Sequence, residues 1–286
     1  MTRLTASGLD AAAACLGSAV LPGVDEEGEY SAGGTALHRF LEHARQDRDS
    51  ALAAAPEDDR DFFAGLELEA IPAGLSSEVA LAYHPVRDEG RILEDTRGRA
   101  YPELGAGWIY GTADLLGVVE RDGVKRVVVP DLKRYQAPRS ARSSLQLGFY
   151  ALAAARAVGA EEAEVSFLVP RHDGRWYVDR AGLDAMDLAE LRDRISDLRR
   201  RVARAAADVS EERPIPLVVG EQCTYCRARR LCPAQVTPLA LAVRADLDAL
   251  AAEALPGEVL VKERITSLAP EARGRLFSRA VQLKDF

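Results

Sequence analysis

Apolar residues recur along the chain with two different periods, and each period predicts one type of element. Apolar positions three and four apart are typical of amphipathic helices, whereas short apolar runs are typical of strands. Helical spacing covers Leu9–Leu16, Ser31–Gln46, Ser143–Val158, Ala189–Ala207 and Leu239–Leu255, and a further helix opens at Ser267 or Pro270. Strand-like runs cover Glu78–Tyr83, Trp108–Glu120, Lys125–Lys133, Glu164–Val169 and Arg175–Val178. This order of elements predicts an α/β or α+β core.

The runs Trp108–Glu120 and Lys125–Lys133 are separated by a turn that contains Asp122 and Gly123. Asp-Gly between two apolar runs is typical of a tight β-hairpin, so the two strands are expected to be antiparallel neighbours. This pairing would bring Asp114 close to Asp131 across the sheet. Asp131 and Lys133 are two residues apart, so their side chains lie on the same face of an extended strand.

Composition and charge narrow the class of protein. The chain has 286 residues, enough for a full core, and no apolar stretch approaches the roughly 20 residues of a membrane-spanning helix. We expect a cytoplasmic protein with no membrane contact. The net charge of −8 argues against a polycation that coats DNA, but local patches matter more than the total. The stretch Lys125–Arg142 is such a patch, with six basic residues, Arg134 and Arg139 among them, against Asp131 alone.

Two carboxylates and a lysine at strand ends suggest metal-dependent chemistry on a phosphodiester. Asp114 and Asp131 would bind a hard divalent cation such as Mg²⁺ or Mn²⁺, and the carbonyl oxygen of Leu132 could add a backbone ligand. His38 could add a nitrogen ligand, which favours Mn²⁺ somewhat. Lys133 would polarise the attacking water or stabilise negative charge on the phosphate. An Asp-x-Lys pair alone is more often a surface salt pair, so its setting decides the interpretation.

That setting resembles the PD-(D/E)xK nuclease superfamily, in its RecB-like branch. The matching motifs are Gly34-Thr35-Ala36-Leu37-His38, Gly111-Thr112-Ala113-Asp114, Pro130-Asp131-Leu132-Lys133 and Gln146-Leu147-Gly148-Phe149-Tyr150. The resemblance implies a restriction-endonuclease-like fold, a mixed central sheet flanked by helices. It also implies that His38, Asp114, Asp131 and the Leu132 carbonyl bind the metal and that Asp114, Asp131 and Lys133 form the catalytic set.

Further residues are candidates for contact with DNA or metal. The resemblance implies that Gln146 and Tyr150 line the DNA path, and their spacing of four places both on one helix face. Arg134 and Arg139 of the basic stretch are expected to bind DNA as well. Glu78 has a counterpart in the family, where it would orient a metal-bound water or contact the lysine; an ordinary strand-start glutamate is the alternative.

Four cysteines, Cys15, Cys223, Cys226 and Cys232, form the last motif. In a cytoplasmic chain they are not expected to form disulfides, and four thiolates suit either Zn²⁺ or an iron–sulfur cluster. One N-terminal cysteine with a C-terminal trio resembles the iron–sulfur nucleases: the AddB nuclease domain, CRISPR-associated RecB-like exonucleases and phage relatives. That resemblance implies a [4Fe–4S] cluster that ties the ends of the domain together.

These observations lead to one expected function. We expect a nuclease domain over residues 1–236, with a C-terminal iron–sulfur segment, and a helical extension over residues 237–286. It would be a Mg²⁺- or Mn²⁺-dependent deoxyribonuclease, an exonuclease on single-stranded or end-opened DNA, working with a helicase, recombination or CRISPR-adaptation partner. The alternative is a nuclease-like subunit that binds DNA ends without significant cleavage.

Overall fold

The computed structural model describes residues 4–23, 29–94, 100–135, 139–229 and 232–234. The chain divides into two compact units, residues 1–13 with 27–204 and residues 14–26 with 205–286. The predicted helices over Leu239–Leu255 and from Ser267 or Pro270 lie outside the described residues. So does the predicted domain boundary after residue 236, which stays a prediction.

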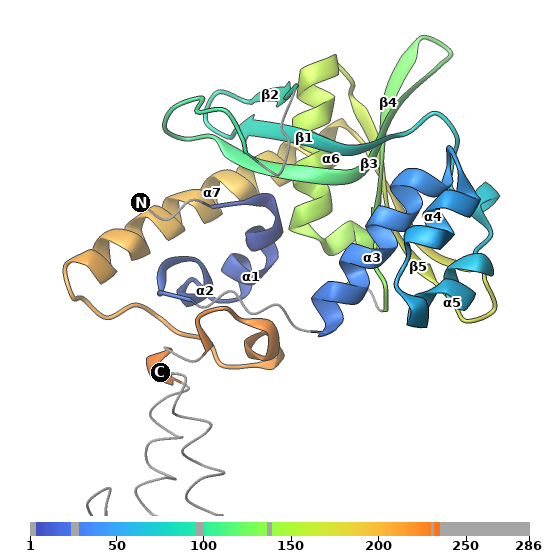
Figure 1. Ribbon diagram of the computed structural model, residues 1–286. Coiled ribbons are helices and arrows are strands. Elements are labelled where there is room, and N and C mark those ends of the chain that lie inside the picture. Colours follow the sequence, from blue (N-terminus) through green and yellow to red (C-terminus); the bar gives the residue numbers. More distant parts are fainter. Residues whose placement is uncertain (1–3, 24–28, 95–99, 136–138, 230–231, 235–286) are drawn as a thin grey trace, which may run out of the picture. The chain divides into compact units, whose positions relative to one another are not determined.

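The first unit is built on a six-stranded mixed sheet. Its strands are β1 (Ser76–His84), β2 (Glu89–Ile92), β3 (Ile109–Arg121), β4 (Val124–Leu132), β5 (Glu162–Pro170) and β6 (Trp176–Leu183). Their order is β2-β1-β3-β4-β5-β6, and every neighbouring pair is antiparallel except β4 and β5, which are parallel. The expected mixed sheet flanked by helices is therefore confirmed (Figure 1).

Two connections fix the centre of this sheet. The β3–β4 hairpin turns at Asp122 and Gly123, which both have positive φ, 54° and 77°. This is the left-handed geometry that favours Asp-Gly in a two-residue hairpin, as the sequence predicted. The parallel β4–β5 pair needs a crossover, which is supplied by α6 (Leu145–Val158). α6 begins after its N-cap Ser144 and ends at Gly159, a left-handed C-cap with φ 69°.

Three helices, α3 (Glu29–Ala44), α4 (Arg48–Ala54) and α5 (Arg60–Ala64), gather beside one end of the sheet (Figure 1). Their apolar residues share one buried cluster with residues of β3, β4 and β5. Within it the Phe40 and Phe63 rings stack with centroids 4.7 Å apart, and Leu132 and Leu168 come from the neighbouring parallel strands. This cluster holds α3 against the strand ends, and His38 lies on α3.

The remaining helices are α1 (Leu9–Ala14), α2 (Gly17–Val20) and the long α7 (Ala185–Ser210). Gly148 of α6 allows a close approach, because a Cβ at this position would lie 2.6 Å from a Leu191 methyl of α7. In the second unit, the cysteine segment forms a 3₁₀ turn over Glu221–Tyr225. Among the described residues, no helix is long and apolar enough to cross a membrane.

Candidate metal-dependent active site

The candidate site lies where β3 and β4 separate. The two strands pair from Arg121↔Val124 to Gly117↔Val128, and continuing this register brings Asp114 level with Asp131. Beyond Gly117 the two strands no longer pair through their backbones. Instead, Asp114 Oδ2 on β3 accepts a hydrogen bond of 2.7 Å from the Leu132 N–H on β4. The expectation that the hairpin brings the two acids close is confirmed.

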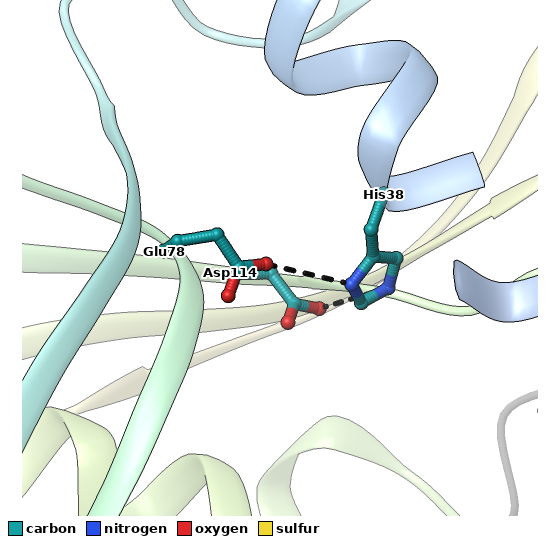
Figure 2. Close-up of side chains that lie close together, drawn as sticks. All are labelled: His38, Glu78 and Asp114. Carbon is teal, nitrogen blue, oxygen red and sulfur yellow. Dashed lines mark ion pairs between the residues drawn. The ribbon is translucent and has the colours of Figure 1, made fainter. Parts of the chain in front are cut away.

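His38 reaches this fork from α3. Its Nε2 lies 3.3 Å from the Leu132 carbonyl oxygen and 3.6 Å from Asp114 Oδ2. Its Nδ1 lies 3.7 Å from Glu78 Oε1 on β1. Figure 2 shows the Glu78 and Asp114 carboxylates both pointing at the imidazole ring. One ligand atom each from His38, Glu78 and Asp114 lie within 4.8 Å of one another, a spacing that a single metal ion can bridge.

Glu78 reaches the group through an unusual backbone conformation. It lies inside β1 with φ +51°, although it is not glycine. Its neighbours pair normally with β3, as Ser77↔Leu115 and Val79↔Ala113, so the distortion falls on the residue level with Asp114. For a non-glycine residue, a backbone conformation with positive φ costs about 1–3 kcal/mol, and it persists only where the surrounding structure imposes it. Such strain is concentrated at functional sites, which strengthens Glu78 as a metal-site candidate.

Asp131 and Lys133 form the second half of the site. The Asp131 carboxylate is buried, and its Oδ2 lies 2.5 Å from Lys133 Nζ. This short contact joins the two side chains as a buried ion pair, and the Lys133 ammonium group is the partner of that oxygen. A carboxylate in this position is suited to bind a metal ion as well as the ammonium group. Asp131 nevertheless lies outside the His38–Glu78–Asp114 group, so its role as a ligand stays a prediction.

The charges of the site are strongly coupled. Burial, and then the neighbouring Asp131 carboxylate, raise the pKa of Asp114 to about 7. Burial lowers the pKa of His38, but Glu78, Asp114 and the Leu132 carbonyl outweigh it and raise that pKa overall. A divalent cation would relieve the repulsion between Asp114 and Asp131, so the donor set fits a hard metal ion. The His38 imidazole would supply a nitrogen ligand, which Mn²⁺ accepts.

Lys133 stays positively charged in these surroundings. Burial lowers the pKa of its ammonium group, but the Asp131 carboxylate outweighs that effect and raises it. Its Nζ also lies 5.6 Å from the centre of the Phe167 ring. A lysine held protonated beside a carboxylate can donate hydrogen bonds to a phosphate, but it is not a base for water.

Asp10 is a component that the sequence reasoning missed. Its carboxylate accepts hydrogen bonds from Ser144 Oγ (3.0 Å) and from the N–H groups of Leu145 (2.9 Å) and Gln146 (3.3 Å) at the start of α6. It also forms an ion pair with Arg139 at 3.1 Å. Asp10 therefore anchors the N-terminal segment to the helix that crosses behind the site, by contacts that no local pattern reveals.

The predicted DNA-contact residues occupy different environments. Gln146 Nε2 donates to the Tyr150 hydroxyl at 3.2 Å, and Tyr150 is only 2% exposed. The Arg134 guanidinium lies 3.9 Å from the centre of the Phe62 ring and 2.9 Å from Asp59. Arg134 and Arg139 line a common cavity. Contact of these four residues with DNA stays a prediction.

The four cysteines all belong to the second unit. The Val218 N–H donates to Cys15 Sγ at 3.4 Å, and Cys223 Sγ donates to the Val218 carbonyl at 3.8 Å. Burial raises the pKa of Cys226, and the nearby thiols of Cys223, Cys15 and Cys232 raise it further. Within the described residues, however, no three sulfurs come together as closely as the ligand atoms of the His38–Glu78–Asp114 group. A compact metal–thiolate site is therefore absent from this part of the chain.

Comparison with known proteins gives one family. The model of the PD-(D/E)XK nuclease superfamily matches residues 3–233, a span that contains the sheet, the fork and the four cysteines. No curated protein matches the chain. A solved structure described as "Crystal structure of SSO0001" is 20% identical, over 74% of this chain and 89% of that chain, with a TM-score of 0.32. An overlap this low adds nothing to the fold described above.

Proposed function

Because this chain belongs to the PD-(D/E)XK nuclease superfamily, and is therefore a metal-dependent nuclease, we propose that it hydrolyses DNA at the β3–β4 fork. One observation carries this proposal: His38, Glu78 and Asp114 converge beside the buried Asp131–Lys133 pair. Neither a surface salt pair nor a structural histidine explains this concentration of buried charge, which is unfavourable unless it is compensated.

The donor set suits Mg²⁺ or Mn²⁺, held by Glu78, Asp114 and His38 together with the Leu132 carbonyl and Asp131. Such an ion, when bound, supplies Lewis-acid activation of water and of the phosphate. The protein positions the ligands in two ways. Leu132 N–H fixes the Asp114 carboxylate, and the strained backbone of Glu78 aims its carboxylate at the same point.

Lys133 serves the phosphate. Its ammonium group is held by Asp131 at the end of β4, so it needs little reorganisation to donate to a phosphate oxygen as negative charge develops there. Preorganised donors of this kind typically contribute about 10²–10³ to the rate. The buried Asp131 carboxylate would thus contact both the ammonium group of Lys133 and the cation.

The test is cleavage of DNA by the purified full chain. Single- and double-stranded oligonucleotides, labelled at the 5′ or the 3′ end, are incubated with Mg²⁺, Mn²⁺ or EDTA. We expect cleavage that requires the metal and that Asp131→Ala abolishes with the fold intact by circular dichroism. Arg121→Ala, at a 91% exposed side chain of the β3–β4 turn, is the control and should cleave normally. Undiminished cleavage by Asp131→Ala would reject the site.

Finer aspects of the function are part of the same proposal. We expect an exonuclease of the RecB-like branch that acts in the cytoplasm on single-stranded or end-opened DNA. A helicase, recombination or CRISPR-adaptation partner would supply unwound ends. The labelled substrates separate these features, since an exonuclease releases mononucleotides or short products from one end first. Metal-independent DNA binding without cleavage would favour the alternative, a DNA-end-binding subunit.

The cysteines support a second part of the proposal, a [4Fe–4S] cluster bound by Cys15, Cys223, Cys226 and Cys232. Their mutual influence on the pKa of Cys226 supports a common site. A tetrahedral zinc site, with Zn–S bonds of about 2.3 Å, needs sulfurs only about 3.8 Å apart. Within the described residues no three sulfurs form such a group, so the choice of the cluster over zinc rests on the resemblance of the cysteine pattern to the iron–sulfur nucleases. Protein purified without oxygen should absorb near roughly 400 nm, where iron–sulfur charge transfer falls; colourless protein with stoichiometric zinc would reject the cluster.

A further inference from the structure

A cavity of about 1160 Å³ opens in the first unit where the parallel strands β4 and β5 end. Its walls come from Phe62 of α5, from the segment after β4 and from the β5–β6 hairpin. The first lining residue after β4 is Arg134, directly beyond Lys133, whose N–H still pairs with the Leu168 carbonyl at 2.9 Å. This volume is slightly above the roughly 300–1,000 Å³ of typical small-molecule sites, which leaves room for a short segment of polymer.

Two half-exposed tyrosine rings line this cavity. Tyr135 is 50% exposed and Tyr177 is 47% exposed, which is unusual for large apolar rings within a concave surface. The Arg171 guanidinium lies 5.6 Å from the centre of the Tyr177 ring, and that of Arg134 lies 5.2 Å from the centre of the Tyr135 ring. Each exposed tyrosine thus has an arginine beside its ring, a combination that binds stacked bases and their phosphates.

Arginine and aspartate side chains both line the cavity, and several of them already have partners. Arg139 is paired with Asp10, and the acid Asp173 is bound by Arg175 at 2.6 Å. The other acid of the lining, Asp179, accepts the Ala141 N–H at 2.7 Å. Asp173 is therefore paired with Arg175 and Asp179 bonds to the backbone with its charge retained, while the Arg171 guanidinium remains a cationic group of the lining that can bind an anion.

We propose that this cavity binds an unpaired DNA strand, with bases stacked on Tyr177 and Tyr135 and a phosphate bound by Arg171. The proposal rests on the proposed nuclease function, and it adds the residues that would bind an unpaired strand. A duplex keeps its base faces stacked on one another, whereas an unpaired strand offers them to aromatic side chains. Arg134 lines the cavity and directly follows Lys133 of the proposed active site in the sequence.

The test is binding of a fluorescent oligothymidylate to the full chain in EDTA, followed by anisotropy. We expect Tyr177→Ala to weaken binding on the order of 5- to 100-fold, the effect of losing one base–aromatic stack, and Tyr177→Phe to bind normally. On a strand of abasic sites, Tyr177→Ala should bind as the parent does. Val178→Ala removes a 39% exposed side chain from the other face of β6 and is the control.

Arg171→Ala provides an independent variant at an exposed turn, which carries the test should Tyr177→Ala fail to fold. This variant should bind both the oligothymidylate and the abasic strand more weakly. The slope of log K against log salt should fall by about 0.7, the value for one phosphate contact on a single strand. Arg121→Ala also removes one exposed arginine, and it should change neither the affinity for these strands nor the salt slope.

Two results would overturn the cavity proposal: parental binding by Tyr177→Ala and Arg171→Ala together, or an equal loss for Tyr177→Ala on the abasic strand. The nuclease function is judged separately by metal-dependent cleavage. Cleavage with unaltered binding by these variants rejects the cavity alone. Tyr177-dependent binding with no cleavage in any metal rejects the hydrolysis and retains the cavity.

Discussion

Replacing Asp114 by asparagine should stabilise the metal-free protein, and the gain should grow with pH. The side chain is 11% exposed, and its pKa is raised from an ordinary value of 3.8 to about 7. The folded state therefore keeps a proton that the unfolded chain loses near pH 4. Stability associated with this carboxyl is fully present below pH 4 and is lost as the pH rises through 7. The shift corresponds to about 4 kcal/mol, an upper limit for the gain in Asp114→Asn at pH 8.

Asparagine keeps the acceptor that the Leu132 N–H needs, so the substitution removes charge without removing the hydrogen bond. The assay is urea unfolding in EDTA, followed by circular dichroism, at pH 5 and at pH 8. Asp114→Asn should exceed the parent by more at pH 8 than at pH 5, while Mn²⁺ stabilises the parent alone. Asp122→Asn, at a 92% exposed carboxylate, should show no such pH dependence. A difference for Asp114→Asn that does not increase with pH would refute the electrostatic reasoning.

Three further predictions concern neighbouring parts of the site. Mn²⁺ affinity, measured by calorimetry, should fall at least tenfold for each pH unit below about 7, because Asp114 and His38 must both lose their protons to bind the ion; a flat profile would contradict this. Glu78→Gly relieves a positive φ, so metal-free stability should not fall while Mn²⁺ affinity should; the same change at Val79 should destabilise the fold. Asp10→Ala should lower the free energy of unfolding by about 1–3 kcal/mol through loss of the α6 contacts, and an unchanged urea midpoint would show that they contribute nothing.

The sequence predicts well those parts of the fold that rest on local pattern. Asp122-Gly123 predicts the hairpin, and the hairpin register brings Asp114 to Asp131 without further information. The strands β1, β3, β4 and β5 and the helix α6 follow from apolar runs that are buried as expected. The short strand β2 was missed, because Glu89–Ile92 contains few apolar residues and is held by pairing with β1.

Other features depend on contacts between distant residues or on backbone strain, so they could not be predicted. Asp10 accepts a hydrogen bond from Ser144, which is 134 residues away in the sequence. No sequence pattern near Asp10 indicates that it caps this helix. Glu78 was a candidate by resemblance alone, and its positive φ appears only in the structure. The cavity combines α5 with the ends of two strands, so its tyrosines and Arg171 have no common sequence pattern.

If the fork between β3 and β4 performs metal-dependent hydrolysis, Lys133 should be needed for the reaction but not for binding the metal, because it is not among the proposed ligands. The measurement is the single-turnover rate of DNA cleavage at saturating Mn²⁺ by Lys133→Gln and by the parent. We expect Lys133→Gln to be folded and to bind Mn²⁺, with a cleavage rate lower than that of the parent by about 10²–10³. A parental rate in Lys133→Gln would contradict this expectation and would place the chemistry elsewhere.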